Sequence, residues 1–298
     1  MCDLSDHTEG LLCQNIYLEY KNKIHNWLTE TEVSFMPNPN YLKKQTQIRH
    51  SEREILINWL IIIQVEFNLQ PETLYITVNI IDRFLSKKRI ALDRLQLLGI
   101  TAMHIASKFQ EIYPPIMSDF IQMTKNSFRA RQMSNMETDV LKVIAFDINC
   151  TPTQTFLENY SRAIGVSEPR VLIYTSFLLD LSLIKAEFLY FRPSHITVCA
   201  LAMAIMREQR LTGQDYSEKL HYLEEVMELE QYDGQTFKQC KRLFDKFTGK
   251  LGTEGLHLPN TTSLVRKYAG TGALNFEPKA LKDVLRSSGS TRQTSSSH

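Results

Sequence analysis

The sequence predicts an all-α protein in which an N-terminal helix precedes two tandem sets of five helices. Apolar residues recur at helical spacing over long stretches, and prolines and capping residues divide these stretches into helix-sized segments. With 298 residues, 43% of them hydrophobic, the chain is long enough for about two domains of roughly 150 residues each. We expect a leader and helix over 1–50, helical units over 51–150 and 151–250, and a polar tail over 251–298.

The first unit is predicted to contain five helices. Ser51 and Glu54 have the spacing of a capping box, and Pro71 stands where a proline is tolerated in a first helical turn. The break at YPP (113–115) fixes the turn between the third and fourth helices. The segment that follows Pro71 is apolar on nearly every side, so we expect its helix to lie at the centre of the unit. The predicted helical segments are 51–63, 71–86, 92–108, 115–123 and 133–146.

The second unit is predicted to start at Thr151, which has the position of an N-cap before the first-turn residue Pro152. Its predicted helical segments are 151–163, 171–184, 194–208, 220–229 and 235–247. The two units show no repeat at the level of residues, so the helix count is what suggests a duplication. The tail from Gly252 is rich in polar residues, and we expect it to bury little and roughly its last dozen residues to be disordered.

Composition argues against several classes of protein. The net charge is +1, with basic and acidic residues interleaved, whereas nucleic-acid-binding domains usually carry a basic stripe. The longest nearly apolar run, 196–206, is far shorter than the ~20 residues that span a membrane. The five cysteines are far apart and form no C-x-x-C pair, which fits reduced thiols in an intracellular protein without bound zinc. We find no metal-ligand spacing, phosphate-binding loop or catalytic set, and expect neither an enzyme nor a cofactor.

Four charged residues lie within otherwise apolar helical runs: Arg53, Asp82, Lys108 and Glu137. A charge left alone in a dry core costs several kcal/mol or more, so each must be paired or must face a partner. We expect Arg53 and Asp82 to pair with each other as a structural ion pair. For Lys108 and Glu137 the residues alone leave both an internal pair and a partner-facing pair open.

Two segments, ETLYITVNIIDRFLS (72–86) and ASKFQEIYPP (106–115), resemble the cyclin box. The residues that recur in the cyclin family fall, without insertions between them, on Arg53, Asp82, Leu97, Lys108 and Glu137.

The type of cyclin is suggested by other segments. The sequence MPNPNYLKKQ (36–45) resembles the segment before the box in mitotic cyclins, while FD (146–147) and LSLI (181–184) favour the A-type. The resemblance covers roughly 17–248.

The resemblance implies two tandem cyclin folds and a regulatory subunit that binds and activates a cyclin-dependent serine/threonine kinase. Such a subunit positions helix C of the kinase and controls the cell cycle in S, G2 or M phase, in the nucleus and cytoplasm. The residues that match the family's kinase contacts are Tyr20, Ile24, Trp27, Ile105, Lys108, Phe109, Glu137, Leu141, Phe146 and Ile148. For the first three, which share one helix face, packing of the N-terminal helix onto the box is the alternative.

The resemblance also implies a docking patch for substrates or inhibitors that carry an Arg-x-Leu motif. The family's Met-Arg-Ala-Ile-Leu-x-x-Trp sequence appears here as EREILINW (52–59), with glutamates in place of the methionine and the alanine. Ile62 stands where A-type cyclins have an acidic residue. We therefore expect a weakened or shifted specificity at a patch formed by Glu52, Ile55, Leu56, Trp59, Ile62 and Gln96.

Two other functions remain as alternatives. A cyclin-fold scaffold would bind a kinase without activating it, and would keep Phe109 and Leu141 without needing Lys108 and Glu137. A binding module like transcription factor IIB would hold a protein and DNA on two such folds. That module predicts basic faces and a zinc ribbon, and the sequence has neither.

Overall fold

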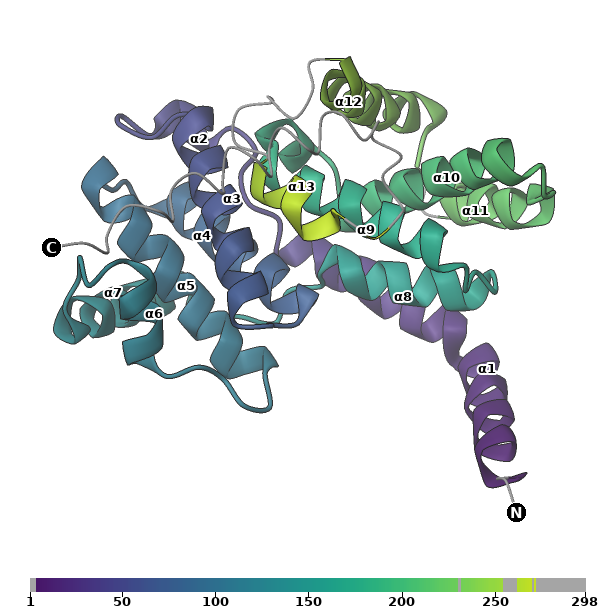
Figure 1. Cartoon of the computed structure of the whole chain (residues 1–298), viewed down its shortest axis with the longest axis horizontal. Coiled ribbons are helices and arrows are strands. Elements are labelled where there is room, and N and C mark those ends of the chain that lie inside the picture. Colours follow the sequence, from purple (N-terminus) through teal and green to yellow (C-terminus); the bar gives the residue numbers. More distant parts are fainter. Residues whose placement is uncertain (1–3, 230–231, 254–261, 270, 272–298) are drawn as a thin grey trace, which may run out of the picture.

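The computed structural model describes residues 4–229, 232–253, 262–269 and 271. Over these residues the chain is helical and has no strand, and the predicted order of an N-terminal helix and two five-helix folds is confirmed (Figure 1). The long helix α1 and the short helix α2 come first, at Leu4–Ser34 and Tyr41–Lys44.

The first fold comprises helices α3 to α7. Their bounds are α3 His50–Glu66, α4 Pro71–Lys87, α5 Leu95–Gln110 after a 3₁₀ turn at Leu92–Arg94, α6 Met117–Met123 and α7 Ala130–Val143. Helix α4 lies at its centre as predicted, since nearly every side chain from Thr73 to Leu85 is buried, and it packs along α5.

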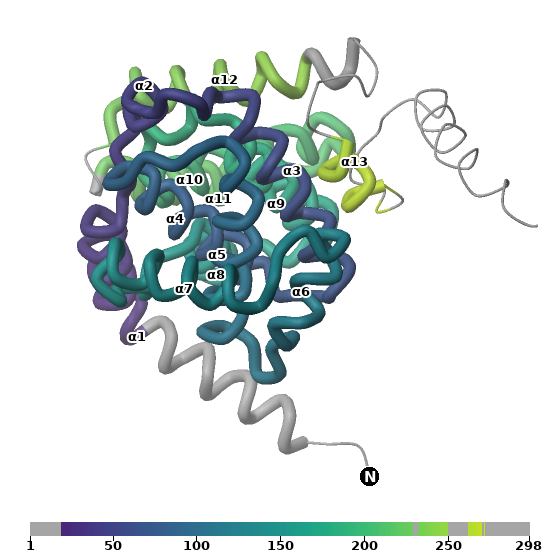
Figure 2. The backbone as a smooth tube through the Cα atoms, turned by 90° about the vertical axis from the view of Figure 1, so that its left-hand side faces the viewer, coloured from purple at the N-terminus to yellow at the C-terminus, as the bar shows by residue number. Residues whose placement is uncertain are grey.

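The second fold comprises helices α8 to α12. Their bounds are α8 Thr153–Ala163, α9 Pro169–Ile184, α10 Pro193–Thr212, α11 Ser217–Leu229 and α12 Gly234–Thr253, with a 3₁₀ segment at Ala186–Tyr190. Here α9 and α10 form the central pair. Figure 2, turned by 90°, shows the first fold in front of the second.

The start of α3 differs from the prediction. The helix begins at His50, and the backbone N–H of Arg49 donates to Glu52 Oε2 at 2.8 Å, so the expected capping box of Ser51 and Glu54 does not form. Glu54 instead accepts a hydrogen bond from Lys185 Nζ at 2.9 Å. Lys185 lies in the second fold, and this distant partner explains why the local pattern was misleading. Similarly, α8 begins after Pro152, so Thr151 is not its N-cap.

The arginine of a buried ion pair in the first fold, which the sequence predicted, also binds the second fold. Arg53 binds Asp82 with two hydrogen bonds, from Nε at 2.8 Å and from Nη2 at 2.7 Å. The remaining Nη1 donates to the carbonyl oxygens of Leu183 and Ile184, both at 3.0 Å, in the last turn of α9. Tyr41 also donates to Asp82, at 2.6 Å. Arg53 therefore satisfies a carboxylate in the first fold and a helix end in the second.

The expectation that the tail from Gly252 buries little is wrong for residues 262–268. These residues form helix α13 (Thr262–Tyr268), which packs against α3 and α9 and buries Leu264, Val265 and Tyr268 (Figure 1). Asp180 of α9 accepts hydrogen bonds there from Lys267 Nζ at 2.7 Å and from Tyr268 at 2.8 Å. The last dozen residues, expected to be disordered, lie outside the described residues.

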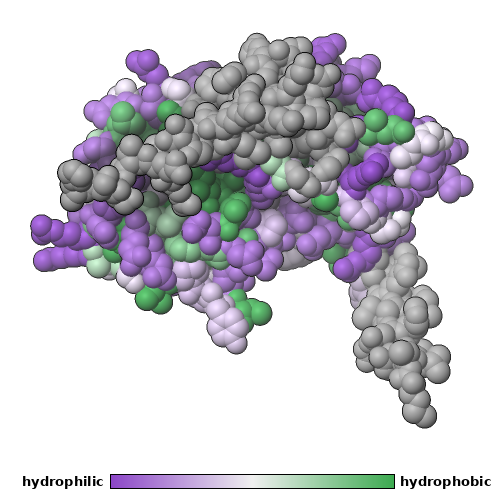
Figure 3. All heavy atoms as spheres, in the orientation of Figure 1, coloured by the Kyte–Doolittle hydropathy of each residue, from purple (hydrophilic) through white to green (hydrophobic). Residues whose placement is uncertain are grey.

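No helix in the part of the chain that the structure describes is long and apolar enough to cross a membrane. Nor do the described residues contain a cluster of three or more side chains arranged to hold a metal ion. In the orientation of Figure 1 the surface is mainly hydrophilic, with hydrophobic atoms gathered in a hollow near its centre (Figure 3).

Candidate functional site

Lys108 and Glu137 face each other across two neighbouring helices, α5 and α7. Lys108 is in the last turn of α5, Glu137 is in the middle of α7, and the Lys108 ammonium forms an ion pair with Glu137 Oε1. The pair is at the surface, with 44% of the lysine side chain exposed. An ammonium group carries three donors, so Lys108 keeps hydrogen-bonding capacity for a partner while it holds Glu137.

Apolar residues follow both members of this ion pair along the chain. Phe109 and Phe146 are exposed by 51% and 66%, while Leu141 and Ile148 are partly buried against the core. Ile105, which the sequence placed in the same contact set, is only 3% exposed. It lies in the core one helical turn before Phe109 and has almost no surface to offer, so we remove it from the contact set.

The turn after α7 gives Phe146 its exposure. Ala145 and Phe146 both have a φ of +58°, in the left-handed region that side chains other than glycine rarely adopt. Arg83 holds this turn, because its Nη1 donates to the carbonyl oxygen of Asp147 at 2.8 Å. Such local strain costs on the order of 1–3 kcal/mol and clusters at functional sites.

Three exposed apolar residues after α5 are absent from the predicted site. Ile112, Tyr113 and Ile116 follow α5 and are exposed by 87%, 92% and 65%. Exposure of this size for adjacent large apolar side chains is unusual for a surface without a partner. The available signal was the apolar pair directly before two prolines in IYPP (112–115).

Tyr20, Ile24 and Trp27 form an exposed stripe along α1. Their exposed fractions are 44%, 37% and 56%, whereas Leu28 on the neighbouring face of the helix is buried. The alternative that this stripe packs the helix onto the box is therefore wrong. Helix α1 instead packs against α8 and α10 of the second fold.

The predicted docking patch forms a groove of about 340 Å³. Its lining consists of Glu52, Ile55, Leu56, Trp59, Leu92, Leu95 and Gln96. Leu92 and Leu95 are additions to the predicted set. Ile62 is exposed but does not line the groove.

The two glutamates that replace the family's methionine and alanine behave differently. Glu52 lines the groove, whereas Glu54 does not and is paired with Lys185. Although slight burial acts in the opposite direction, backbone hydrogen bonds lower the pKa of Glu52. Its carboxylate is therefore charged at neutral pH, and it gives the groove a negative rim.

Comparison with known proteins identifies the family of both folds. The family models for the cyclin N-terminal and C-terminal domains match residues 23–149 and 151–271. Cyclin-A2 of Xenopus laevis is 37% identical over 229 residues, which are 76% of this chain and 52% of the relative. Cyclin-A2 of Homo sapiens is 40% identical over 203 residues, 68% of this chain and 46% of the relative. The chain thus spans about half the length of these curated relatives.

The fold itself is found in solved structures. The X-ray structure of a viral cyclin from herpesvirus saimiri superposes with a TM-score of 0.62 at 22% identity, covering 75% of this chain and 98% of that chain. At this identity the likeness concerns the fold alone. Together with the two matching domain models, which cover most of the sequence, it leads to one conclusion: the chain belongs to the cyclin family.

Proposed function

We propose that the chain is a non-catalytic regulatory subunit that binds and activates a cyclin-dependent serine/threonine kinase. A protein kinase is active only when its strand-three lysine pairs with the glutamate of helix C, and this pairing depends on where helix C lies. A rigid apolar surface pressed against helix C would hold it in that position. The observation that carries the proposal is the Lys108–Glu137 ion pair across α5 and α7, with the exposed Phe109 next to Lys108 and the exposed Phe146 in the turn after α7.

The apolar and charged parts of this surface have different roles. Burial of Phe109, Leu141, Phe146 and Ile148 would supply most of the affinity, because apolar burial is the main driving force of association. Lys108 and Glu137 would bind backbone groups of the kinase before helix C. Each such charge-assisted hydrogen bond contributes about 1.5–3 kcal/mol, and it fixes the orientation of the partner.

Phe109 offers a sharp test of this binding mode. Kinase affinity is measured for wild type, Phe109→Ala and Leu211→Ala by titration with a purified cyclin-dependent kinase. Leu211 is a matched control because it is exposed by 52%, against 51% for Phe109, but lies at the end of α10. Loss of an aromatic contact of about 2 kcal/mol predicts an affinity about thirtyfold lower for Phe109→Ala. Equal affinities of the two variants would contradict the proposed surface.

The groove on α3 is proposed to bind Arg-x-Leu peptides with a changed preference. Ile55, Leu56 and Trp59 supply the apolar part, and Glu52 supplies a negative charge for the arginine from the side of the groove. The expected result is that Glu52→Gln weakens a peptide with the arginine more than the same peptide with alanine in its place. A parallel loss for both peptides would show that Glu52 does not meet the arginine.

The setting of this activity is also a proposal. Relatives named cyclin-A2 favour an A-type cyclin that acts in S, G2 or M phase, in the nucleus and cytoplasm. We further propose domain limits of 51–150 and 151–250 for the two cyclin folds.

A further inference from the structure

The C-terminal end of α1 is attached to the second cyclin fold through one buried carboxylate. Glu32 is 2% exposed, and it accepts hydrogen bonds from the backbone N–H of Ser194 at 2.9 Å and from the Ser194 hydroxyl at 2.7 Å. Ser194 is itself fully buried, in the first turn of the twenty-residue helix α10. The contact joins residues that are 162 positions apart.

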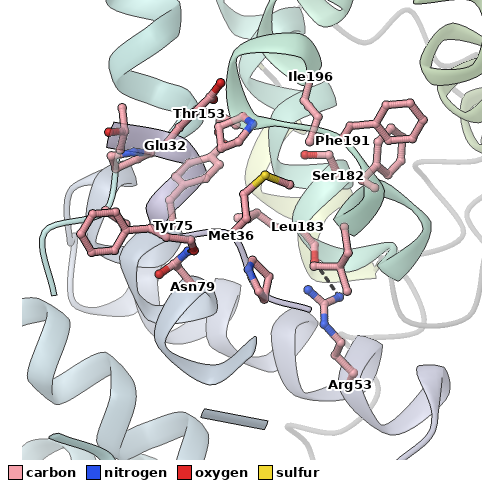
Figure 4. A pocket seen from close by; sticks show the side chains of 18 residues that line it. Glu32, Met36, Arg53, Tyr75, Asn79, Thr153, Ser182, Leu183, Phe191 and Ile196 are labelled. Atoms are coloured by element: carbon pink, nitrogen blue, oxygen red, sulfur yellow. Dashed lines mark hydrogen bonds between the residues drawn. The ribbon is translucent and has the colours of Figure 1, made fainter. Parts of the chain in front are cut away.

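Charge makes this contact stronger than an ordinary hydrogen bond. The first N–H groups of a helix have no acceptor within the helix, and the helix dipole makes its N-terminus partly positive. A carboxylate that accepts from this N–H group is therefore bound by a charge-assisted hydrogen bond. Glu32 also lines a cavity of about 110 Å³ between the folds, and Arg53 lines another side of the same cavity (Figure 4).

The chain is held by the first fold directly after this point. Asn79 Nδ2 donates to the carbonyl oxygen of Phe35 at 2.9 Å, and the Arg83 guanidinium lies 4.9 Å from the centre of the Phe35 ring. Helix α1 is thus fixed beyond its end by the first fold and at Glu32 by the second. Two attachment points on different folds define the direction in which the helix leaves the body.

The direction of α1 matters because the exposed stripe lies upstream of Glu32 on the same helix. Trp27 and Tyr20 come five and twelve residues before Glu32, which at 1.5 Å per residue places them about 8 and 18 Å along the axis. A tilt of about 10° at Glu32 would displace Tyr20 by about 3 Å at that distance. A displacement of this size would separate the stripe from a surface that it contacts.

We propose that Glu32 and Ser194 form a clamp through which the second cyclin fold sets the position of the stripe Tyr20, Ile24 and Trp27 on the kinase. Glu32 is then a positioning residue that acts through the stripe. This inference rests on the proposed function, since it assumes that the stripe meets a kinase.

The test combines a measurement without kinase and one with kinase. Amide hydrogen exchange over residues 19–31 is compared for wild type, Glu32→Ala and Glu30→Ala. Glu30 is the matched control because it lies on the same helix with an exposed side chain. Faster exchange in Glu32→Ala alone is the expected result, and unchanged exchange would overturn the clamp.

Kinase affinity is then measured in a double-mutant cycle of Glu32→Ala with Trp27→Ala. We expect Glu32→Ala to weaken binding about tenfold in the wild-type background and less than twofold in the Trp27→Ala background, because the stripe is already impaired there. Equal losses in both backgrounds would indicate general destabilisation and overturn the inference. Glu32→Gln, which keeps an acceptor oxygen for Ser194, should restore part of the affinity, and Ser194→Ala provides a milder variant if Glu32→Ala does not fold.

The outcomes separate this inference from the proposed function. If wild type binds no cyclin-dependent kinase, the proposed function fails and the inference fails with it. If wild type binds and only the cycle is additive, the inference alone is wrong.

Discussion

Replacement of Asp82 by asparagine should strongly destabilise the protein, because it leaves the buried Arg53 charge without its counterion. The Arg53 side chain is 1% exposed, and Asp82 accepts two of its hydrogen bonds together with one from Tyr41. An asparagine keeps one acceptor oxygen but places an NH₂ group opposite Arg53 Nη2, now 2.7 Å from the carboxylate. The main remaining partners of Arg53 would then be the carbonyl oxygens of Leu183 and Ile184.

The size of this effect follows from burial. Removal of one partner of a buried ion pair costs about 3–5 kcal/mol, which is a large fraction of a typical unfolding free energy of about 5–15 kcal/mol. The double variant Arg53→Met with Asp82→Leu removes both charges, and should cost less than Asp82→Asn alone. The loss of stability in Asp82→Asn should affect both folds, since Arg53 also binds the end of α9.

Urea denaturation followed by circular dichroism measures these differences. Asp139→Asn is the matched control, because Asp139 pairs with Lys88 at 2.6 Å while both side chains are substantially exposed, at 33% and 45%. Such exposed pairs contribute about 0–1 kcal/mol. A loss below about 1 kcal/mol for Asp82→Asn, or equal losses for both variants, would refute the reasoning.

Three further predictions concern pH, the tail and the docking groove. Burial and a nearby arginine lower the pKa of His195 to about 4, whereas an unfolded histidine titrates near 6.5. As the pH falls, the unfolded state therefore binds a proton first, and the free energy of unfolding should decrease from about pH 6.5 towards 4. His195→Phe should flatten this part of the profile of urea midpoint against pH. Lys267→Met should lower the unfolding free energy by about 3 kcal/mol, because it removes the cation from the buried Asp180, and an unchanged urea midpoint would contradict this. A methyl group on Gly99 would lie 2.6 Å from Cδ1 of Leu56, which lines the groove. Gly99→Ala should therefore lower the unfolding free energy by about 1–2 kcal/mol and weaken the binding of Arg-x-Leu peptides in a titration. Unchanged peptide affinity would contradict this prediction.

The sequence predicted the helices well where their apolar pattern is long. Helices α4 and α10 each begin with a proline and continue with a long, mainly apolar run of buried residues. The start signal and the apolar pattern therefore predict the same helix. The errors concern contacts between distant segments. Glu54 fits a local capping box but pairs with Lys185. The apolar residues of α13 belong to a tail whose average composition is polar, so composition did not reveal them. Local patterns contain no information on which distant partner competes for a side chain.

The candidate site shows the same division. Charges inside apolar runs correctly pointed to Arg53 and Asp82 as a pair, since burial without a partner is too costly. The exposure of Phe109 and the burial of Ile105 depend instead on how deep each turn of α5 lies in the assembled fold. One helical turn separates the two residues, so periodicity assigns them to the same face.

The most direct test of the proposed activation is a titration of a purified cyclin-dependent kinase with this protein, measured as histone phosphorylation. We predict a saturable rise in activity, and loss of that rise for Lys108→Ala with Glu137→Ala in a variant that still unfolds cooperatively. A kinase that binds the wild-type protein without a rise in activity would make the chain a scaffold. Absence of binding would contradict the proposed function altogether.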